Sequence, residues 1–162
     1  MIYIDMDDVC ADLNGYVNKT FGCDKRVGEP IQRAHWNELV SYHPRLFRDL
    51  EINAQFLPAF EMILRACRRG EIAFLTALPY QTHFPYASMD KVDWIREHFG
   101  AEYPVFFGPY AADKHLHCKA GDLLIDDNAE NCQQWELQGG VGRVYRNETF
   151  YDWFAEGNYF RR

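Results

Sequence analysis

Short apolar runs recur along the chain and are separated by segments that have a helical period. Runs of this length and composition are typical of strands that are buried on both faces of a parallel sheet. They predict five strands, at residues 1–5, 72–76, 105–107, 123–125 and 141–145. Because strands and helices alternate, we expect an α/β fold with a doubly wound parallel sheet.

Three segments repeat apolar residues with the period of a helix. The first has Pro58 in its first turn and stops at Gly70, and the second takes Ser88 as its N-cap and stops at Gly100. The third covers residues 128–138. The region around Trp153 ends the chain and is assigned no element.

Residues 10–55 are irregular and rich in aromatic side chains, with helical pieces near 10–20 and 30–40. This segment is too long for a simple connection between a strand and a helix. We interpret it as an insertion that covers the active end of the sheet. Residues 1–162 are otherwise expected to form a single domain.

Composition excludes several classes of protein. The net charge of −7 argues against binding to a nucleic-acid polymer or to an anionic membrane surface. No apolar run approaches 18 residues, and no signal peptide precedes the first strand, so we expect a cytoplasmic protein. The five cysteines include no CxxC pair and are interpreted as reduced thiols, and His115, His117 and Cys118 lack a second ligand pair at zinc spacing.

Carboxylates follow two of the predicted strands. Asp5 and Asp7 come after the first strand, and Asp126 and Asp127 come after the fourth. In an open α/β sheet the carboxyl ends of the strands form the ligand site, so these side chains converge if the two strands are adjacent. Like charges about 4 Å apart repel by about 4 kcal/mol at an effective dielectric constant of about 20. The cluster therefore predicts a cation, and oxygen ligands favour Mg²⁺. Taken alone, each aspartate pair could also be a solvated turn or a helix N-cap.

These residue types suggest a phosphoryl-transfer site. Either Asp5 or Asp7 can act as a carboxylate nucleophile, and the other as a general acid and base. The hydroxyl of Thr76 and the backbone N–H groups that follow it, from Ala77 on, can hold a phosphate oxygen. A lysine is needed to offset the negative charge, and both Lys114 and Lys119 precede the fourth strand.

Several motifs together carry a resemblance to a known family. They are Asp5-Met6-Asp7-Asp8-Val9-Cys10-Ala11-Asp12, the stretch from Asp122 to Asp127, and Lys91 and Trp94 followed by Glu97-His98-Phe99-Gly100. With Thr76 and Lys114 in order between them, the chain resembles the haloacid dehalogenase-like (HAD) phosphohydrolases. It is most similar to the 5′(3′)-deoxyribonucleotidases. The resemblance implies a Rossmann-like sheet with a small helical cap after the first strand, and Mg²⁺-dependent removal of phosphate from deoxyribonucleoside monophosphates.

The resemblance also implies roles for single residues. Asp5 would be the nucleophile and Asp7 the acid and base. Mg²⁺ would be held by Asp5, by the Asp7 carbonyl and by Asp126 or Asp127. The phosphate would be bound by Thr76, Ala77 and Lys114, and Lys91 matches a further lysine of the family. One departure is Asp8, which stands where the family has glycine. A second is that Lys119 lies nearer to the aspartate pair than Lys114, which we prefer for its Asp113-Lys114 context.

Trp36, Tyr42, His43 and Phe47 of the insertion could stack on a base, or could simply pack the insertion onto the sheet. The substrate is expected to be a nucleotide or another small phosphomonoester, and the protein could form a homodimer. A catalytically silent HAD-like binding protein and a phospho-receiver module are the alternatives from other functional classes.

Overall fold

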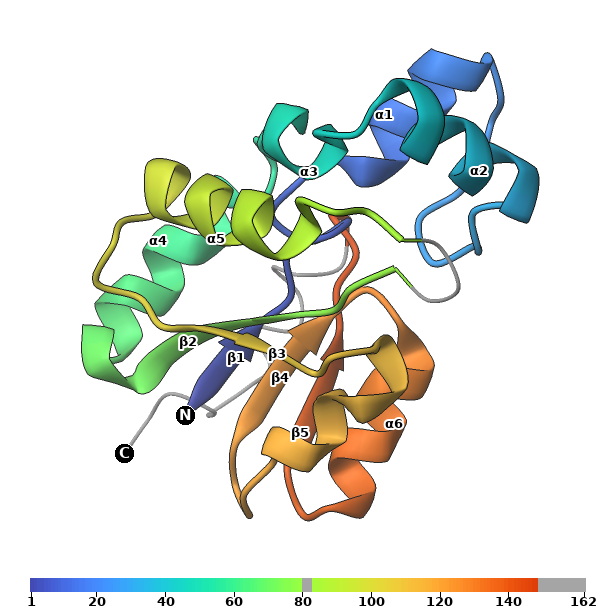
Figure 1. Cartoon of the computed structure of the whole chain (residues 1–162). Coiled ribbons are helices and arrows are strands. Elements are labelled where there is room, and N and C mark those ends of the chain that lie inside the picture. Colours follow the sequence, from blue (N-terminus) through green and yellow to red (C-terminus); the bar gives the residue numbers. More distant parts are fainter. Residues whose placement is uncertain (80–82, 149–162) are drawn as a thin grey trace.

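The chain folds around a sheet of five parallel strands (Figure 1). A computed structural model describes residues 1–79 and 83–148, so the region of Trp153 lies outside the described residues. The strands are β1 (Ile2–Ile4), β2 (Ile72–Thr76), β3 (Val105–Phe107), β4 (Leu123–Asp126) and β5 (Val141–Val144). Their spatial order is β3-β2-β1-β4-β5, and every neighbouring pair is parallel. The predicted doubly wound, Rossmann-like parallel sheet is confirmed.

The central strand β1 brings the predicted site residues to one edge of the sheet. Ile4 is in register with Phe74 of β2 and with Ile125 of β4. The next residue, Asp5, continues the pairing, since its N–H donates to the Ile125 carbonyl at 2.9 Å. Asp5 therefore lies between the carboxyl ends of β2 and β4, where Thr76 and Asp126 end their strands.

Helices cover both faces of the sheet (Figure 1). They are α4 (Leu57–Ala66), α5 (Ala87–His98) and α6 (Ala129–Leu137), with the short 3-10 helices η1 (Arg69–Glu71) and η2 (Ala111–His117). Successive strand residues point to opposite faces, so β1 contributes to two cores. Ile2 and Ile4 belong to the larger core under α4 and α5, and Tyr3 packs with Trp135 of α6 in the smaller one.

Two predicted helix ends are wrong. Gly70 does not end α4, because the chain turns to an extended conformation at Cys67 and Gly70 lies in η1. Ser88 is not an N-cap, because it already lies inside α5. This helix begins at Ala87, and its N-cap residue, Tyr86, makes no capping hydrogen bond with its side chain. Pro58 does lie in the first turn of α4, and Asn128 caps α6 by accepting from the Glu130 N–H at 2.9 Å.

Residues between β1 and α4 form a helical insertion beyond the carboxyl ends of the strands (Figure 1). Its helices are α1 (Leu13–Phe21), α2 (Arg33–Tyr42) and α3 (Leu46–Asp49). The two segments that connect it to the sheet are hydrogen-bonded to each other. The Asp12 N–H donates to Glu51 O at 2.9 Å, and the Asn53 N–H donates to Cys10 O at 2.8 Å. We call this antiparallel pair, residues 10–12 with 51–53, the neck.

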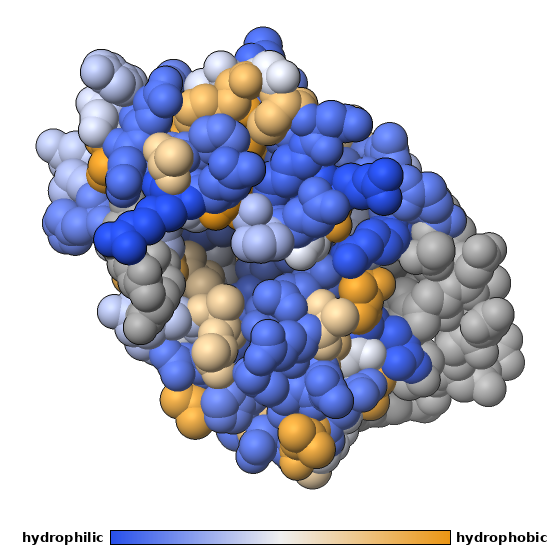
Figure 2. Space-filling view, turned by 90° about the vertical axis from the view of Figure 1, so that its right-hand side faces the viewer, coloured by the Kyte–Doolittle hydropathy of each residue, from blue (hydrophilic) through white to orange (hydrophobic). Residues whose placement is uncertain are grey.

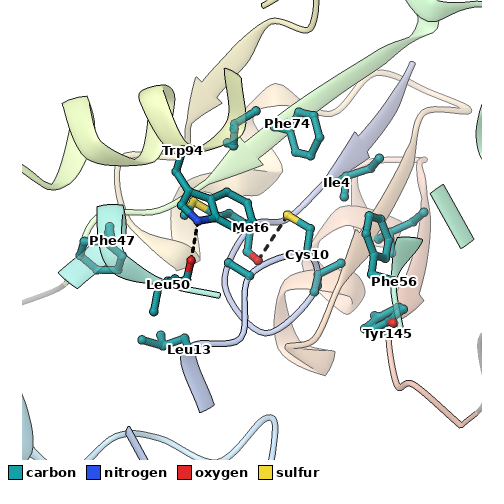
Figure 3. Packing of buried hydrophobic residues seen from close by; sticks show 14 of the residues in the cluster. Ile4, Met6, Cys10, Leu13, Phe47, Leu50, Phe56, Phe74, Trp94 and Tyr145 are labelled. Atoms are coloured by element: carbon teal, nitrogen blue, oxygen red, sulfur yellow. Dashed lines mark hydrogen bonds between the residues drawn. The ribbon is translucent and has the colours of Figure 1, made fainter. Parts of the chain in front are cut away.

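The insertion shares the larger core with α5 (Figure 3). The indole N–H of Trp94 donates to the Leu50 carbonyl at 2.8 Å, and Phe47 is 1% exposed. Arg45 forms an ion pair of 2.6 Å with Asp90, which is fully buried on α5. These contacts fix α3 against the body of the protein. None of the described helices is both long and apolar enough to cross a bilayer.

Asp8 has an unusual backbone conformation. It is the only described non-glycine residue with a positive φ, at +58°. Aspartate tolerates this left-handed conformation better than most residues because its short side chain can bond locally. Asp8 Oδ1 accepts from the Asn14 N–H at the start of α1, and its Oδ2 lies 3.8 Å from Lys25 Nζ. This explains how an aspartate replaces the glycine expected at this turn.

We predict that Asp8→Ala lowers the free energy of unfolding by about 2–3 kcal/mol, because the change removes a cap and leaves a Cβ at positive φ. Asp8→Gly tolerates the positive φ and should lower the free energy of unfolding by about 1 kcal/mol. Asp8→Asn should lower it by less. Urea unfolding measures the ranking, with the exposed Asp24→Ala as the control. Equal losses for alanine and glycine would show that the left-handed conformation carries no cost.

Candidate active site

A cavity of about 390 Å³ opens at the carboxyl edge of the sheet, beneath the insertion. The body of the protein lines it with Asp5, Asp7, Lys114 and Asp127, and the insertion lines it with residues 28–30. Figure 2 shows this side of the molecule, where mainly hydrophilic residues surround the recess between the insertion and the sheet. The volume lies within the range of small-molecule sites.

Lys114 joins the two acidic strand ends. It lies in η2, is 2% exposed, and places its Nζ 2.7 Å from both Asp5 Oδ1 and Asp126 Oδ2. Burial alone would lower the pKa of Lys114, but Asp126 and Asp5 outweigh it and raise this pKa above its usual value. Lys114 therefore carries a fixed positive charge at the floor of the cavity.

The two adjacent aspartates at the end of β4, Asp126 and Asp127, differ in their surroundings. Asp126 is fully buried, and it accepts hydrogen bonds from Lys114, from the Asn128 N–H at 2.9 Å and from Asn131 at 3.1 Å. Asp127 faces the cavity, and no described residue donates a hydrogen bond to its carboxylate. Asp126 is therefore held in place by protein donors, whereas Asp127 has oxygens free for a ligand.

Asp7 is held by a second buried lysine. Lys91, on α5, is fully buried and donates to Asp7 Oδ2 and, at 2.9 Å, to the Thr76 hydroxyl oxygen. The ring of Phe47 lies 4.3 Å from Lys91 Nζ and covers its other side. Asp7 Oδ1 is buried and accepts no hydrogen bond from any described residue. One oxygen of Asp7 is thus fixed, and the other is free to bond or to carry a proton.

The acidic cluster is electrostatically crowded. Burial raises the pKa of Asp5 to about 7; Lys114 opposes this shift, and Asp126 and Asp7 add to it. Burial also raises the pKa of Asp127 to about 8, with further contributions from Asp5 and Asp126. Without a cation, these groups hold protons near neutral pH, which is the behaviour of carboxylates that share one site.

Asp5, Asp126 and Asp127 have the geometry and chemistry of a cation site. One ligand oxygen from each lies within 4.8 Å of the others. The donor set consists of carboxylates, which suits a hard divalent cation. The raised pKa values and the free oxygens of Asp127 also fit a cation that binds at the cavity wall.

The sequence-predicted site residues come together at this edge, but at different depths. Ala77 and Lys114 line the cavity. Thr76 and Lys91 are fully buried beneath it, and the Thr76 hydroxyl oxygen accepts from Lys91. Lys119 lies near the start of β4, at the opposite edge of the sheet, where its N–H donates to Asp122. Of the two candidate lysines, only Lys114 reaches the acidic cluster.

The aromatic residues considered for base stacking do not line the cavity. Phe47 is buried against Phe84, and Trp36 packs edge-on against the same ring. The His43 ring nitrogen bonds to the Tyr16 hydroxyl at 2.8 Å, and Tyr42 is 77% exposed. In residues 1–79 and 83–148, the lining of the cavity contains no aromatic ring. Phe47, Trp36 and His43 pack the insertion, as the alternative interpretation predicts, whereas Tyr42 is mostly exposed.

Sequence reasoning missed several residues of the site. Asn131 lies one turn into α6 and faces Asp126, and the N-cap position of Asn128 was the only signal for this contact. Gly28 and Glu29 reach the cavity from the loop between α1 and α2. Their sequence carries no motif, so their position could only come from the fold of the insertion.

The chain matches a model of a known protein family. The family model described as "5' nucleotidase, deoxy (Pyrimidine), cytosolic type C protein" covers residues 1–149. No curated protein matches the chain.

We predict that a divalent cation stabilises the protein, because it replaces repulsion among Asp5, Asp126 and Asp127 with attraction. Relative to chelator-treated protein, Mg²⁺ at one hundred times its dissociation constant should raise the free energy of unfolding by about 2.7 kcal/mol. This corresponds to an increase in Tm of about 5–10 °C. Differential scanning calorimetry measures this shift.

The matched variants are Asp127→Asn, which removes a ligand, and Glu130→Gln, which changes an exposed carboxylate at the rim of the same cavity. Asp127→Asn should lose the Mg²⁺ shift although its metal-free Tm equals or exceeds that of the wild type. Glu130→Gln should keep the shift. A wild-type protein whose Tm ignores Mg²⁺ would contradict the cation site.

Proposed function

Because the chain belongs to the HAD-like family of cytosolic type C 5′ nucleotidases, whose members are phosphoric monoester hydrolases, we propose that it is a Mg²⁺-dependent phosphatase of nucleoside monophosphates. The proposed reaction releases phosphate from (deoxy)ribonucleoside monophosphates through an aspartyl-phosphate intermediate. The observation that carries the mechanism is the arrangement of Asp5 and Asp7 on one cavity, each fixed through one carboxylate oxygen by its own buried lysine.

In the first half of the reaction, a carboxylate oxygen of Asp5 attacks phosphorus and the bond to the leaving oxygen breaks. Asp5 is supported as nucleophile because Lys114 and the Met6 N–H, at 2.8 Å, both hold its Oδ1. Asp7 donates a proton to the leaving oxygen. Its Oδ1, which accepts no hydrogen bond from any described residue, is the proposed site of that proton.

In the second half, Asp7 takes a proton from a water molecule, and the resulting hydroxide attacks the phosphorus. The bond between phosphorus and Asp5 breaks, which releases phosphate, restores the Asp5 carboxylate and leaves Asp7 protonated, as it was at the start of the cycle. Lys91 keeps Asp7 in place throughout, because its other contacts to Thr76 and Phe47 fix the ammonium group. Lys114 offsets the charge on the phosphoryl oxygens.

Mg²⁺ would be held by Asp5, by Asp127 and by the backbone carbonyl of Asp7, and when bound it would stabilise negative charge that develops on the phosphoryl group. We assign Asp126 a supporting role, because its two oxygens are already hydrogen-bonded. Thr76 and Ala77, at the end of β2, would contribute to the phosphate site.

The substrate is proposed to be a nucleotide on the strength of the family. A second candidate substrate is another small phosphomonoester. It is favoured by the cavity, whose described lining lacks an aromatic ring that could stack on a base. We further propose that the protein acts in the cytoplasm on small molecules, without a nucleic-acid polymer or a membrane as partner, and that it could do so as a homodimer.

A phosphate-release screen tests the proposed function. It compares ribo- and deoxyribonucleoside monophosphates with sugar phosphates, in Mg²⁺ and in chelator. The highest kcat/KM is expected for a nucleotide, and activity should vanish in chelator. A preference for sugar phosphates would support the second candidate, and full activity in chelator would refute the metal-dependent mechanism.

The two lysines before β4 provide a matched pair. Lys114→Ala should lower kcat/KM by about 100-fold or more, since a charge-assisted contact to a phosphoryl oxygen is worth about 2–4 kcal/mol. Lys119→Ala removes the same charge at the far edge of the sheet and should change kcat/KM by less than about 3-fold. Steady-state kinetics on the best substrate decides, and the reversed ranking would exclude Lys114 as the phosphate lysine.

Asp5→Asn and Asp7→Asn should both lose turnover, but in different ways. An amide at position 5 cannot form the phosphoryl ester, so no covalent phosphate should be trapped. Asp7→Asn should retain more of its phosphorylation rate on p-nitrophenyl phosphate than on a nucleotide, because nitrophenolate leaves without a proton. Acid quenching followed by mass spectrometry locates the phosphate, and its presence on Asp7 or on a histidine would overturn the assignment.

A further inference from the structure

Arg146 connects the end of β5 to the backbone of Asp127. Its Nη1 donates to the Asp127 carbonyl at 2.7 Å and to the Tyr145 carbonyl at 2.6 Å. The neighbouring backbone is also tied, since the Tyr145 N–H donates to Asp126 O at 2.8 Å. One guanidinium group therefore bridges the residues that follow β4 and β5.

The same guanidinium contacts the insertion at Gly28. This glycine has φ +84°, and a Cβ built on it would lie 2.8 Å from Arg146 Nη2 and 3.7 Å from Asp127 O. Gly28 also lines the active-site cavity. A side chain at residue 28 would therefore force the Arg146 guanidinium to shift, and it would also be strained at this φ.

The carboxylate of Asp127 depends on its backbone for its position. Asp126 is held by hydrogen bonds from Lys114, Asn128 and Asn131, whereas no described residue donates to the carboxylate of Asp127. What fixes Asp127 is its main chain, and the donor to its carbonyl is Arg146. Groups that orient a metal ligand from outside the ligand set commonly change metal affinity by about 10–100-fold.

We propose that Arg146 is a positioning residue for Asp127 and that it links the placement of the insertion loop at Gly28 to the metal-binding carboxylate. The inference rests on the proposed function, because it assigns Asp127 as a ligand. Arg146 does not line the cavity; it acts through the Asp127 peptide.

The test measures Mn²⁺ binding directly, by electron paramagnetic resonance on substrate-free full-length protein, together with Tm. Arg146→Ala should weaken Mn²⁺ binding about tenfold or more. Arg146→Lys keeps one donor for the Asp127 carbonyl and should weaken Mn²⁺ binding less than Arg146→Ala does. The control Arg65→Ala removes an arginine that is 80% exposed on α4, and it should bind Mn²⁺ as the wild type does.

A second variant tests the link to the insertion. Gly28→Ala adds a methyl group against the guanidinium and should weaken Mn²⁺ binding as well. Gly28→Ala also places a Cβ at φ +84°, which is strained whatever the space around it. The fold-loss of Mn²⁺ affinity caused by Gly28→Ala should therefore be smaller in the Arg146→Ala background than in the wild type, because the group that the methyl displaces is then gone. Additive losses would show that Gly28 acts independently of Arg146.

The outcomes separate the two levels of the proposal. If the wild type binds Mn²⁺ and Arg146→Ala binds it equally well with only a lower Tm, Arg146 is structural and the inference is wrong. If the wild type binds no Mn²⁺ and has no Mg²⁺-dependent activity, the proposed function fails and the inference falls with it.

Discussion

Two buried ammonium groups hold together carboxylates that would otherwise drive one another apart. Lys114 bridges Asp5 and Asp126 across two adjacent strands, and Lys91 holds Asp7, two residues after Asp5. Removing one partner of such a buried pair leaves an uncompensated charge, which is far more costly than the loss of a surface ion pair. The strand order, with β1 between β2 and β4, is what allows both lysines to meet the acidic edge.

The insertion takes part in this arrangement as well as covering it. Phe47 of α3 closes the space around Lys91, and Arg45 neutralises Asp90, the residue beside Lys91 on α5. The covered face of the insertion is therefore bound to the lysine that positions Asp7. Residues 28–30, on the same insertion, line the cavity. The position of the insertion and the geometry of the Asp7 carboxylate are coupled through these contacts.

The sheet and the acidic edge could be predicted from the sequence because both depend on local patterns. Apolar runs marked the strands, and carboxylates directly after two of them had to meet once those strands were neighbours. How deeply each site residue is buried relative to the cavity could not be predicted in the same way. Thr76 and Lys91 lie below the cavity, and the hydrogen bond from Asn131 to Asp126 depends on the packing of α6.

Prediction within the insertion was less complete for a physical reason. Its helices are short and its aromatic residues could either pack or stack, and composition does not distinguish the two. Phe47 is buried because α5 lies against it, and Gly28 reaches the cavity because the loop of residues 22–32 folds back over the strand ends. Ends of helices were also missed, since Cys67 and Tyr86 carry no strong capping signal.

The neck joins the insertion to the sheet at a single place. Because residues 10–12 and 51–53 pair with each other, the chain leaves and re-enters the sheet at a single place, where Ala11 lies opposite Ile52. The length of everything between these points can change without moving β1 or α4. The insertion can therefore vary in length and in the residues that line the cavity, provided that it keeps the contacts of Phe47 and Arg45 with α5, which hold Lys91 against Asp7. For protein engineering, Ala11 and Ile52 mark the splice points at which a module from a related enzyme can be grafted.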